Sequence, residues 1–500
     1  MIKKTVVYSF PLYVVITIFL TQACRSHPTK IVWDQSFAGI GSQSSPRPID
    51  INHDGVDDLV MGACKNEYQP TDMGVLALDG KTGKVLWQVA SDDQVYGSAT
   101  LEDINGDQSQ DVIIGGRWAF LKAIDGSNGK VIWSYTRPDS TDPVLKYAHY
   151  NFYNSVLVPD QNNDGVKDIL IQNGGNHAAS PNDSIHRYPG VLMVFDGKSG
   201  QVLAADLMPD GRESYMAPLY FEQPDKSQWI VFGSGGETFG GHLFLARLED
   251  LMHRQLKNAV IIATEPTSQG FIGPPVLADI NHDQYVDIIS ITHGSSVFAI
   301  DGRTSKMIWS TTIPASESSN SFAVGQFTGD ETPDFFTFVS RGVWPHSTGS
   351  VQVLLDGKDG RIAFTDSIGC AGFSSPVAYD LNHDGTDEVI ISINEYDCNR
   401  GYTATSRLDI ENKLLAINFK NHEIQNIEQL KGFKNIFSTP YLGDLDHDGY
   451  LDIVYSQFYS PTDDLLIFLG MRTKRVSTSI KMKKPVKWGG YMGSNANGQY

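Results

Sequence analysis

The sequence contains little cysteine and little positive charge. Four cysteines among 500 residues are too few for a disulfide-built scaffold, and Cys64, Cys370 and Cys398 lack the paired C-x-x-C spacing of zinc and redox sites. The 39 Lys and Arg residues against 58 Asp and Glu residues give a formal net charge of −19. Such a chain repels a phosphate backbone, so nucleic acid is excluded as the main partner and cations are the favoured ligands.

Long apolar runs are also missing after the first 24 residues, so no further membrane span is expected there. Lys3 and Lys4 precede an uncharged stretch over 5–23, and we expect residues 1–24 to be a signal peptide that directs export of the rest. The segment LTQAC (20–24) resembles a bacterial lipobox, which implies lipidation of Cys24 and attachment to the outer membrane or cell surface. The alternatives are a cleaved signal, which would leave the protein secreted or periplasmic, and an uncut anchor.

A nine-residue acidic pattern recurs along the chain. Its six strong copies are DINHDGVDD (50–58), DINGDQSQD (103–111), DQNNDGVKD (160–168), DINHDQYVD (279–287), DLNHDGTDE (380–388) and DLDHDGYLD (444–452). A degenerate copy, QFTGDETPD, occupies 326–334, and FEQPDKSQW (221–229) stands in the corresponding context. Eight copies with a period near 50 residues indicate an array of supersecondary units.

Each copy is flanked by short segments typical of strands. Apolar, β-branched runs such as DLVMG and DVIIG follow the loops and are too short for helices. A third segment ends in Asp-Gly, as at 79–80, which predicts a tight hairpin, and a fourth carries Lys-apolar-apolar-Trp, as in KVLW (84–87). We therefore predict an all-β fold, a single β-propeller over 30–487 with eight four-stranded blades, or alternatively seven.

An isolated copy of the fourth-strand pattern, KIVW (30–33), stands at the N-terminus. A ring of blades needs closure, so we predict that residues 31–37 join the last blade, although RVSTSIK (475–481) competes for that place. Residues 488–500 are expected to form a C-terminal tail or cap.

The acidic loops have the oxygen spacing of a calcium site. Side chains at positions 1, 3, 5 and 9 and a carbonyl at position 7 can surround a hard cation. About six Ca²⁺ sites are predicted, with these ligands: Asp50, Asn52, Asp54, Val56 and Asp58; Asp103, Asn105, Asp107, Ser109 and Asp111; Asp160, Asn162, Asp164, Val166 and Asp168; Asp279, Asn281, Asp283, Tyr285 and Asp287; Asp380, Asn382, Asp384, Thr386 and Glu388; Asp444, Asp446, Asp448, Tyr450 and Asp452.

An EF-hand begins with similar spacing but needs a Glu at position 12 and flanking helices, which this pattern lacks. Position 6 is glycine in four loops, whereas Gln108 and Gln284 replace it in two, where we expect strain or weaker binding. The 326–334 loop should be weaker still, and 221–229 should bind no metal. The histidines at position 4 should point outward: His53, His282, His383 and His447.

The loop followed by an apolar strand resembles the FG-GAP/VCBS repeats of integrin α-subunit-type propellers, and DGKTGKVLW (79–87) is similar to strands of quinoprotein-like propellers. The resemblance implies calcium at positions 1, 3, 5 and 9 and a propeller fold. It implies no single activity, because the fold hosts many.

Loops on the face opposite the acidic loops are the expected recognition surface. They carry the following candidates: Arg117, Trp118, the 173–189 loop with His186, the 233–242 loop, His293, Arg341, Trp344 and Tyr396. Exposed aromatic, Arg and His side chains there could contact sugar or protein. Cys370 and Cys398 fall in one repeat, where an intrablade disulfide and two unrelated thiols are alternatives; Cys64 is expected to stay free.

No catalytic motif was found, since the chain lacks H-E-x-x-H, G-x-S-x-G and the adjacent Cys pair of quinone-dependent dehydrogenases. The favoured interpretation is a monomeric, non-catalytic extracytoplasmic recognition or scaffold protein, stabilised by calcium, that binds protein or glycan. The alternatives are a calcium-dependent polysaccharide lyase or related glycan enzyme, and an outer-membrane assembly scaffold.

Overall fold

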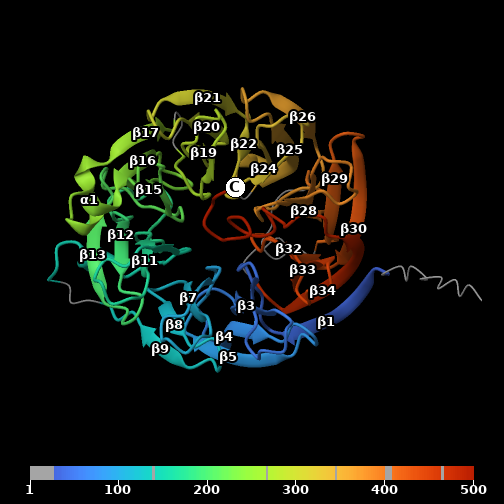
Figure 1. Ribbon diagram of the computed structural model, residues 1–500, viewed down its shortest axis with the longest axis horizontal. Coiled ribbons are helices and arrows are strands. Elements are labelled where there is room, and N and C mark those ends of the chain that lie inside the picture. Colours follow the sequence, from blue (N-terminus) through green and yellow to red (C-terminus); the bar gives the residue numbers. More distant parts are fainter. Residues whose placement is uncertain (1–27, 138–140, 266–268, 344–345, 400–407, 463–466) are drawn as a thin grey trace, which may run out of the picture.

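Eight antiparallel sheets are arranged as blades around a central axis in the computed structural model (Figure 1). The structure describes residues 28–137, 141–265, 269–343, 346–399, 408–462 and 467–500. The predicted all-β, eight-bladed propeller is therefore confirmed, and the seven-bladed alternative is wrong. No helix in these ranges is long and apolar enough to cross a membrane. Cys24, the predicted lipidation site, and Trp344 lie outside the described residues.

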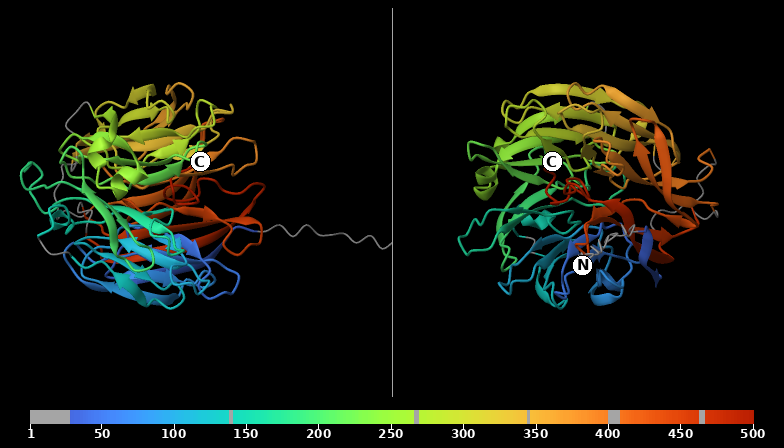
Figure 2. Two further views of the ribbon diagram at one scale, coloured as in Figure 1. Left: turned by 60° about the vertical axis from the view of Figure 1, so that its left-hand side comes forward. Right: turned by 45° about the vertical axis from the view of Figure 1, so that its right-hand side comes forward.

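The blades follow one another in sequence order (Figure 2). The strands of blades 1 to 4 are β2 (Arg47–Ile49), β3 (Asp58–Gly62), β4 (Thr71–Leu78) and β5 (Val85–Ser91); β6 (Thr100–Glu102), β7 (Asp111–Gly115), β8 (Leu121–Ile124) and β9 (Val131–Ser134); β10 (Val156–Val158), β11 (Asp168–Asn173), β12 (Val191–Phe195) and β13 (Val202–Leu207); β14 (Leu219–Glu222), β15 (Gln228–Gly233), β16 (His242–Arg247) and β17 (Val260–Thr264).

Blades 5 to 8 complete the ring, and two of them carry a fifth strand. Their strands are β18 (Val276–Ala278), β19 (Asp287–Ile291), β20 (Ser296–Ile300) and β21 (Met307–Thr312); β22 (Ser316–Glu317), β23 (Ala323–Gly325), β24 (Asp334–Val343), β25 (His346–Leu355) and β26 (Ile362–Asp366); β27 (Val377–Tyr379), β28 (Glu388–Glu395), β29 (Glu411–Asn418) and β30 (Glu423–Lys431); β31 (Phe433–Lys434), β32 (Tyr441–Gly443), β33 (Tyr450–Tyr459), β34 (Gly470–Lys481) and β1 (Lys30–Ala38). Short helices are η1 (Leu145–Tyr147), α1 (Leu248–Met252) and η2 (Leu256–Asn258).

The second strand of each blade lies between neighbouring blades, which explains its composition. β3, β7 and β19 are buried at every residue. Such strands have no solvent-facing side, so their sequences are continuous apolar runs. The outer strand β5 instead alternates buried and exposed residues after its first two positions, because it has one solvent-facing side.

The N-terminal strand closes the ring as predicted. β1 pairs antiparallel with β34, in a register that places Ile31 opposite Val476 and Ala38 opposite Gly470. Residues 475–481, the competing segment, belong to β34 and form the neighbouring third strand. The last blade thus has no free outer edge at β34, and the two ends of the chain are held together.

The C-terminal residues lie at the centre of the ring (Figure 1). Backbone N–H groups of Ala378 and Leu442 donate to the carbonyls of Trp488 and Gly489, and the N–H of Leu277 donates to the carbonyl of Gly498. Trp488 is 1% exposed and donates its indole N–H to the Phe322 carbonyl over 2.8 Å. This segment therefore ties together the inner strands of four blades.

The Asp-Gly segments form a longer turn than predicted. Asp79 accepts from the N–H of Gly83, and it is Gly83, with φ of 70°, that takes the left-handed conformation. Gly80 is required for a different reason, since a Cβ on it would lie 2.1 Å from the Asp57 carbonyl oxygen. The turn thus spans 79–83, and its first glycine allows close packing on the acidic loop.

Tryptophans of the fourth strand join successive blades. Each indole N–H donates to the carbonyl of the first turn glycine in the next blade, and each ring packs on the second. The four pairs are Trp33 with Gly80 (2.8 Å), Trp87 with Gly126 (2.7 Å), Trp133 with Gly197 (2.9 Å) and Trp309 with Gly357 (2.8 Å). The recurrent Lys-apolar-apolar-Trp pattern is thus an interblade contact.

We expect Trp87→Phe to lower the free energy of unfolding by about 1–3 kcal/mol, because it leaves the Gly126 carbonyl buried without its donor. Chemical denaturation monitored by circular dichroism measures this change. Trp229→Phe is the matched control, since the Trp229 indole donates to Ser227 within its own blade. Equal losses in the two variants would contradict an interblade role.

Candidate functional site

The six strong acidic loops share one hydrogen-bonded conformation. The position 1 carboxylate accepts backbone N–H groups from the following turn, as Asp160 does from Asn163 (2.6 Å) and Gly165 (2.8 Å). The position 5 carboxylate accepts the N–H of position 7, as Asp164 does from Val166 at 3.0 Å. These bonds fold the oxygens of positions 1, 3 and 5 into one turn before any ligand is considered.

Gln108 and Gln284 both have a φ of 72° at position 6, where the other loops use glycine. The strain expected at these two residues is therefore confirmed. Position 4 is also left-handed, a feature the sequence analysis missed; His53, for example, has a φ of 56°.

The position 9 carboxylate is buried and links the loop to the next turn of its own blade. Asp58 is 0% exposed; its Oδ2 accepts from the N–H of Ile51 (3.0 Å) and its Oδ1 from that of Gly80 (2.7 Å). Burial raises the pKa of these groups, to about 6 for Asp111, Asp168, Asp287, Asp334 and Asp452 and to about 7 for Glu388. A nearby cation would favour their charged form.

The last loop gathers its carboxylates most tightly. In the described ranges, the group of acidic, His or Cys ligand atoms lying within 4.8 Å of one another consists of Asp444, Asp446 and Asp452. Asp446 Oδ1 and Asp452 Oδ1 are buried without a hydrogen-bond partner. Oxygens left unpaired in a cluster of carboxylates fit a hard cation such as Ca²⁺.

Arg475, which the sequence analysis did not single out, also faces this cluster. It is 1% exposed, and its Nη2 lies 2.7 Å from both Asp446 and Asp452. Its Nη1 donates to the Gly80 carbonyl of blade 1 over 2.8 Å. One guanidinium therefore offsets part of the charge of the last loop and joins the last blade to the first.

The other five strong loops have Asn at position 3, and within the described residues none of them brings three carboxylates within the same 4.8 Å. Their Asn oxygens face the turn, as Asn105 Oδ1 does by accepting from the Asp107 N–H at 2.8 Å. Metal binding by the predicted ligands of these loops stays a prediction.

The two divergent copies differ from the strong loops. In the 326–334 copy, Asp334 keeps the position 9 contacts, accepting from Phe327 (3.0 Å) and Gly357 (3.1 Å). The 221–229 segment comprises the end of β14, a short turn over 223–227 and the start of β15, and its Gln223 accepts the N–H of Val286 in the next blade. Blade 4 thus replaces an acidic loop with an amide contact.

The position 4 histidines of three loops contact the following loop. His53 Nε2 lies 3.3 Å from Ser109 Oγ, His282 Nε2 lies 3.2 Å from Thr332 Oγ1, and His447 Nε2 lies 3.8 Å from Asp57 Oδ1. His53, His282 and His447 are exposed and His383 is half-buried. These rings link neighbouring loops at the surface.

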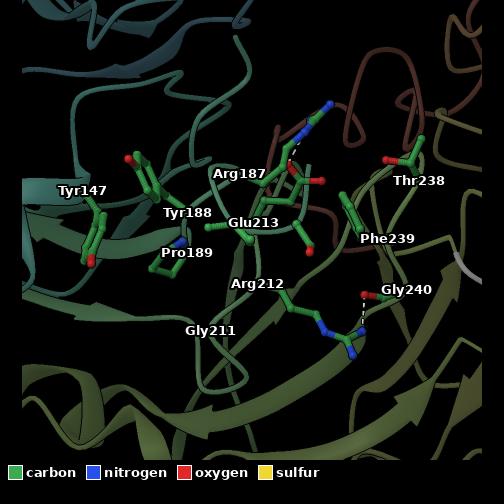
Figure 3. Close-up of a pocket in the computed structure, with 12 residues that line it drawn as sticks. Tyr147, Arg187, Tyr188, Pro189, Gly211, Arg212, Glu213, Thr238, Phe239 and Gly240 are labelled. Carbon is green, nitrogen blue, oxygen red and sulfur yellow. Dashed lines mark hydrogen bonds and ion pairs between the residues drawn. The ribbon is translucent and has the colours of Figure 1, made fainter. Parts of the chain in front are cut away.

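The opposite face carries a cleft of about 750 Å³ between blades 3 and 4 (Figure 3). Tyr147, Tyr188 and Pro189 form one side, and Thr238 and Phe239 form the other. The cleft thus combines two of the predicted loops, 173–189 and 233–242.

An ion pair lies between the two sides of the cleft. Arg187 Nη1 donates to Glu213 Oε2 over 3.0 Å and to the Tyr215 hydroxyl over 2.7 Å. Glu213 is 3% exposed, and its Oε1 has no hydrogen-bond partner. Burial raises its pKa, while Arg187 opposes that shift. Arg212 and Glu213 come from the connection between β13 and β14, which shows no sequence pattern that could have identified them.

The structure brings some of the other predicted residues to this region and leaves others apart. Trp118 lies 4.9 Å from the His177 ring and 6.2 Å from the Tyr150 ring. Burial lowers the pKa of His177 to about 4. His293 instead lies in blade 5, 3.7 Å from Glu317, and Arg341 is exposed on β24 of blade 6.

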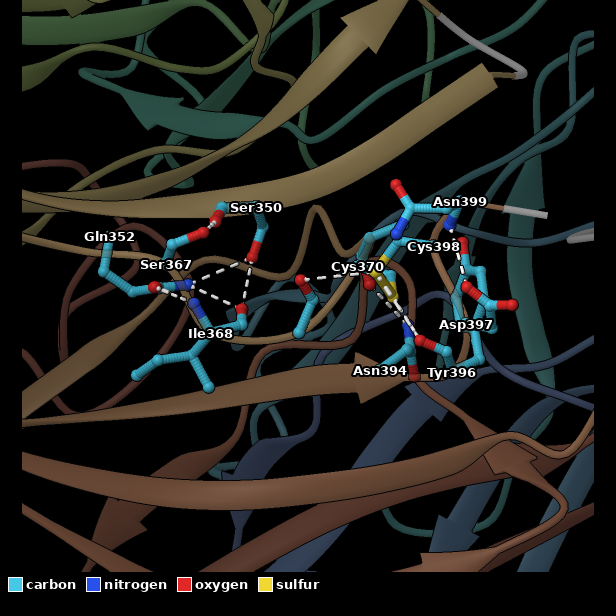
Figure 4. Close-up of a disulfide and its surroundings, with 12 residues drawn as sticks. Ser350, Gln352, Ser367, Ile368, Cys370, Asn394, Tyr396, Asp397, Cys398 and Asn399 are labelled. Atoms are coloured by element: carbon cyan, nitrogen blue, oxygen red, sulfur yellow. Dashed lines mark hydrogen bonds between the residues drawn. A yellow bond between two sulfur atoms is a disulfide. The ribbon is translucent and has the colours of Figure 1, made fainter. Parts of the chain in front are cut away.

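A disulfide joins Cys370 to Cys398 on this face (Figure 4). It connects the segment before β27 with the segment after β28, and the two Cα atoms are 5.4 Å apart. Of the two alternatives predicted from the sequence, the structure contains the intrablade disulfide. Cys64 is free and buried, as expected, and burial raises the pKa of its thiol.

Comparisons with known proteins support the propeller architecture. The family model for the FAM234A/B beta-propeller matches residues 62–258, which run from β3 to η2. No curated protein matches the chain in sequence.

Two solved structures are similar in fold. A europium-containing methanol dehydrogenase has a TM-score of 0.56 at 10% identity, covering 90% of this chain and 93% of its own. The quinohemoprotein alcohol dehydrogenase from Comamonas testosteroni has a TM-score of 0.55 at 11% identity, covering 91% and 77%. At such identities the likeness concerns the fold, and the FG-GAP/VCBS assignment stays a prediction.

In metal-free protein, we expect the free energy of unfolding to fall between about pH 4 and 6.5. Five of the position 9 carboxyls have a pKa of about 6 when folded against 3.8 when unfolded: Asp111, Asp168, Asp287, Asp334 and Asp452. The folded state therefore binds more protons in this window and loses that advantage as pH rises. Asp384, whose pKa is lowered to about 2, titrates below the window. His177, whose pKa is lowered to about 4, gives the opposite slope, but it is one group against several raised carboxyls.

Urea denaturation after dialysis against EGTA, repeated across this pH range, measures the slope. Asp111→Asn removes one titrating group and should flatten it. Stability that stays constant or rises from pH 4 to 6.5 would contradict the expectation.

Proposed function

We propose that this protein is a non-catalytic, extracytoplasmic recognition or scaffold propeller, stabilised by calcium, that binds protein or glycan through the face opposite the acidic loops. The observation that carries the proposal is the cleft between blades 3 and 4, where two loops far apart in sequence place aromatic rings on either side of a buried ion pair. Binding sites commonly combine apolar walls with a few placed polar groups.

The two faces of the ring support a division of roles. The acidic loops are short and alike, and their side chains are engaged mainly with backbone N–H groups of their own turn or of the turn at 79–83 and its equivalents. The loops of the opposite face differ from blade to blade. Recognition residues are generally found on such variable loops held by a rigid scaffold.

Calcium fits the acidic loops through their chemistry. When bound, Ca²⁺ would supply positive charge to oxygens that otherwise repel one another. Asp444, Asp446 and Asp452 would hold it in the last loop, and the oxygens of positions 1, 3 and 5 in the others. Because the folded loop binds the ion and the unfolded chain hardly does, binding would add to folding stability.

An extracytoplasmic location agrees with the disulfide between Cys370 and Cys398, since disulfides persist in oxidising compartments. It also agrees with the leader expected over residues 1–24. The lyase and the assembly-scaffold alternatives have no specific observation in their favour.

Removing calcium should lower the melting temperature by several degrees, because the acidic loops then lose the cation that offsets their charge. Differential scanning calorimetry in EGTA, and again after adding excess Ca²⁺, measures the shift. Asp446→Asn should reduce the Ca²⁺-dependent part, whereas Asp225→Asn, in the blade 4 turn that lacks an acidic loop, should leave it unchanged. An unchanged melt in EGTA would rule out structural calcium.

Ligand binding should be sensitive to the cleft and insensitive to the acidic-loop face. A printed glycan array and a membrane-protein extract are the two probes, and binding is compared between Arg212→Ala, at the cleft, and His53→Ala, on the other face. We expect Arg212→Ala to weaken binding about tenfold and His53→Ala to leave it intact. The reverse order would overturn the proposal, as would an unsaturated product in an ultraviolet lyase assay.

A further inference from the structure

Five aromatic rings form a continuous track across blades 1 to 3 on the face opposite the acidic loops. Successive ring centroids are 6.4 Å apart for Tyr68 and Trp118, 6.2 Å for Trp118 and Tyr150, 6.2 Å for Tyr150 and Tyr188, and 5.6 Å for Tyr188 and Tyr147. The last two residues line the cleft between blades 3 and 4. The rings come from four separate chain segments, so only the blade arrangement makes them neighbours.

Three of these aromatic residues have a left-handed backbone, which is rare for bulky side chains. Tyr68 has a φ of 61°, Trp118 of 52° and Tyr188 of 54°. Such a conformation costs of order 1–3 kcal/mol per residue and is retained where the surrounding structure requires it. Tyr68 is 56% exposed and Tyr188 is 36% exposed, so burial of these rings does not account for the cost. Strained residues of this kind are common at ligand-binding sites.

Three basic residues beside the track pair with carboxylates of the protein. Arg117 pairs with Glu67, Arg187 with Glu213 at 3.0 Å, and Arg212 with Asp210 at 3.8 Å. Arg137 lies over the Trp118 ring at 5.8 Å and Lys146 over the Tyr147 ring at 4.9 Å. Most of the charge beside the track is thus offset within the protein, so a ligand that is itself uncharged suits this surface.

The polar groups at the cleft end of the track suit hydroxyl groups. Glu213 Oε1 is a buried acceptor without a partner, and Arg187 fixes the other carboxylate oxygen. Gly236 packs closely beside it, because a Cβ there would lie 2.8 Å from Glu213 Oε1. A hydroxyl can donate to such an oxygen and accept from a neighbouring group at the same time.

From these observations we infer that the track binds an extended neutral glycan, whose sugar rings lie on successive aromatic rings and whose terminal or branching hydroxyls reach Glu213. This inference rests on the proposed function and names the ligand class of that face. Stacking supplies most of the affinity, so binding depends on how many rings the chain covers.

The test uses the purified full-length chain with a series of neutral oligosaccharides from disaccharide to hexasaccharide, chosen from the best polysaccharide on a printed array. Isothermal titration should show affinity rising with chain length. Trp118→Ala and Tyr188→Ala should each weaken hexasaccharide binding about tenfold. Tyr188→Phe keeps the ring and should change it little.

Phe437→Ala is the matched control, because Phe437 is 36% exposed on the same face and stacks at 5.7 Å on Phe373, outside the track. Thermal melts confirm that each variant is folded. Equal affinity in the ring-removing variants, binding confined to anionic glycans and lost at high salt, or no binding to any glycan would overturn the inference.

A photo-crosslinking residue at Ser184, which lines the cleft, separates the inference from the proposed function. If no glycan binds and the crosslinker captures a protein, the glycan assignment fails while recognition through this face stands. If ligands crosslink only from the acidic-loop face, at His53, both fail.

Discussion

The buried carboxylate at position 9 of each acidic loop is the contact on which the blade geometry depends. Asp58 illustrates it, because one oxygen accepts from the loop backbone at Ile51 and the other from Gly80 in the turn between the third and fourth strands. The carbonyl of the same glycine then accepts the indole of Trp33 from the adjoining blade. Loop, turn and neighbouring blade are thus connected through one residue, Gly80, and the same chain of contacts recurs at Gly126, Gly197 and Gly357.

This network places a large electrostatic cost at one face of the ring. Burial raises the pKa of such a carboxyl group, because the charged form loses its contact with water. The backbone hydrogen bonds nevertheless keep the group in place. Two features of the protein reduce this electrostatic cost. Arg475 brings a guanidinium to Asp446 and Asp452 in the last blade, and Gln223 takes the place of an acidic loop in blade 4. The proposed calcium ions would offset the charge that remains in the strong loops, the last loop included.

The opposite face is free of these constraints, and its loops accordingly differ in length and composition. The scaffold below them is rigid, since the second strands are buried on both sides and the ring is closed by β1 and by the C-terminal residues. Rigid support allows exposed aromatic residues such as Tyr68 and Tyr188 to keep strained backbone conformations. The contacts that stabilise the blades and the proposed recognition surface therefore lie on different faces of the ring.

Sequence alone determined the features that repeat. Eight copies of one spacing predicted eight blades, KIVW (30–33) predicted the closing strand, and the loop pattern located the acidic turns, although not the burial of their position 9 carboxylates. Each of these features depends on contacts within a blade or between adjacent ones. The tertiary structure alone decided the rest: the partner of Cys370, the place of Arg475, the contact between Arg187 and Glu213, and the track from Tyr68 to Tyr147. These residues lie in connections without periodicity, and their separations are set by how the blades pack around the axis, which no local pattern encodes.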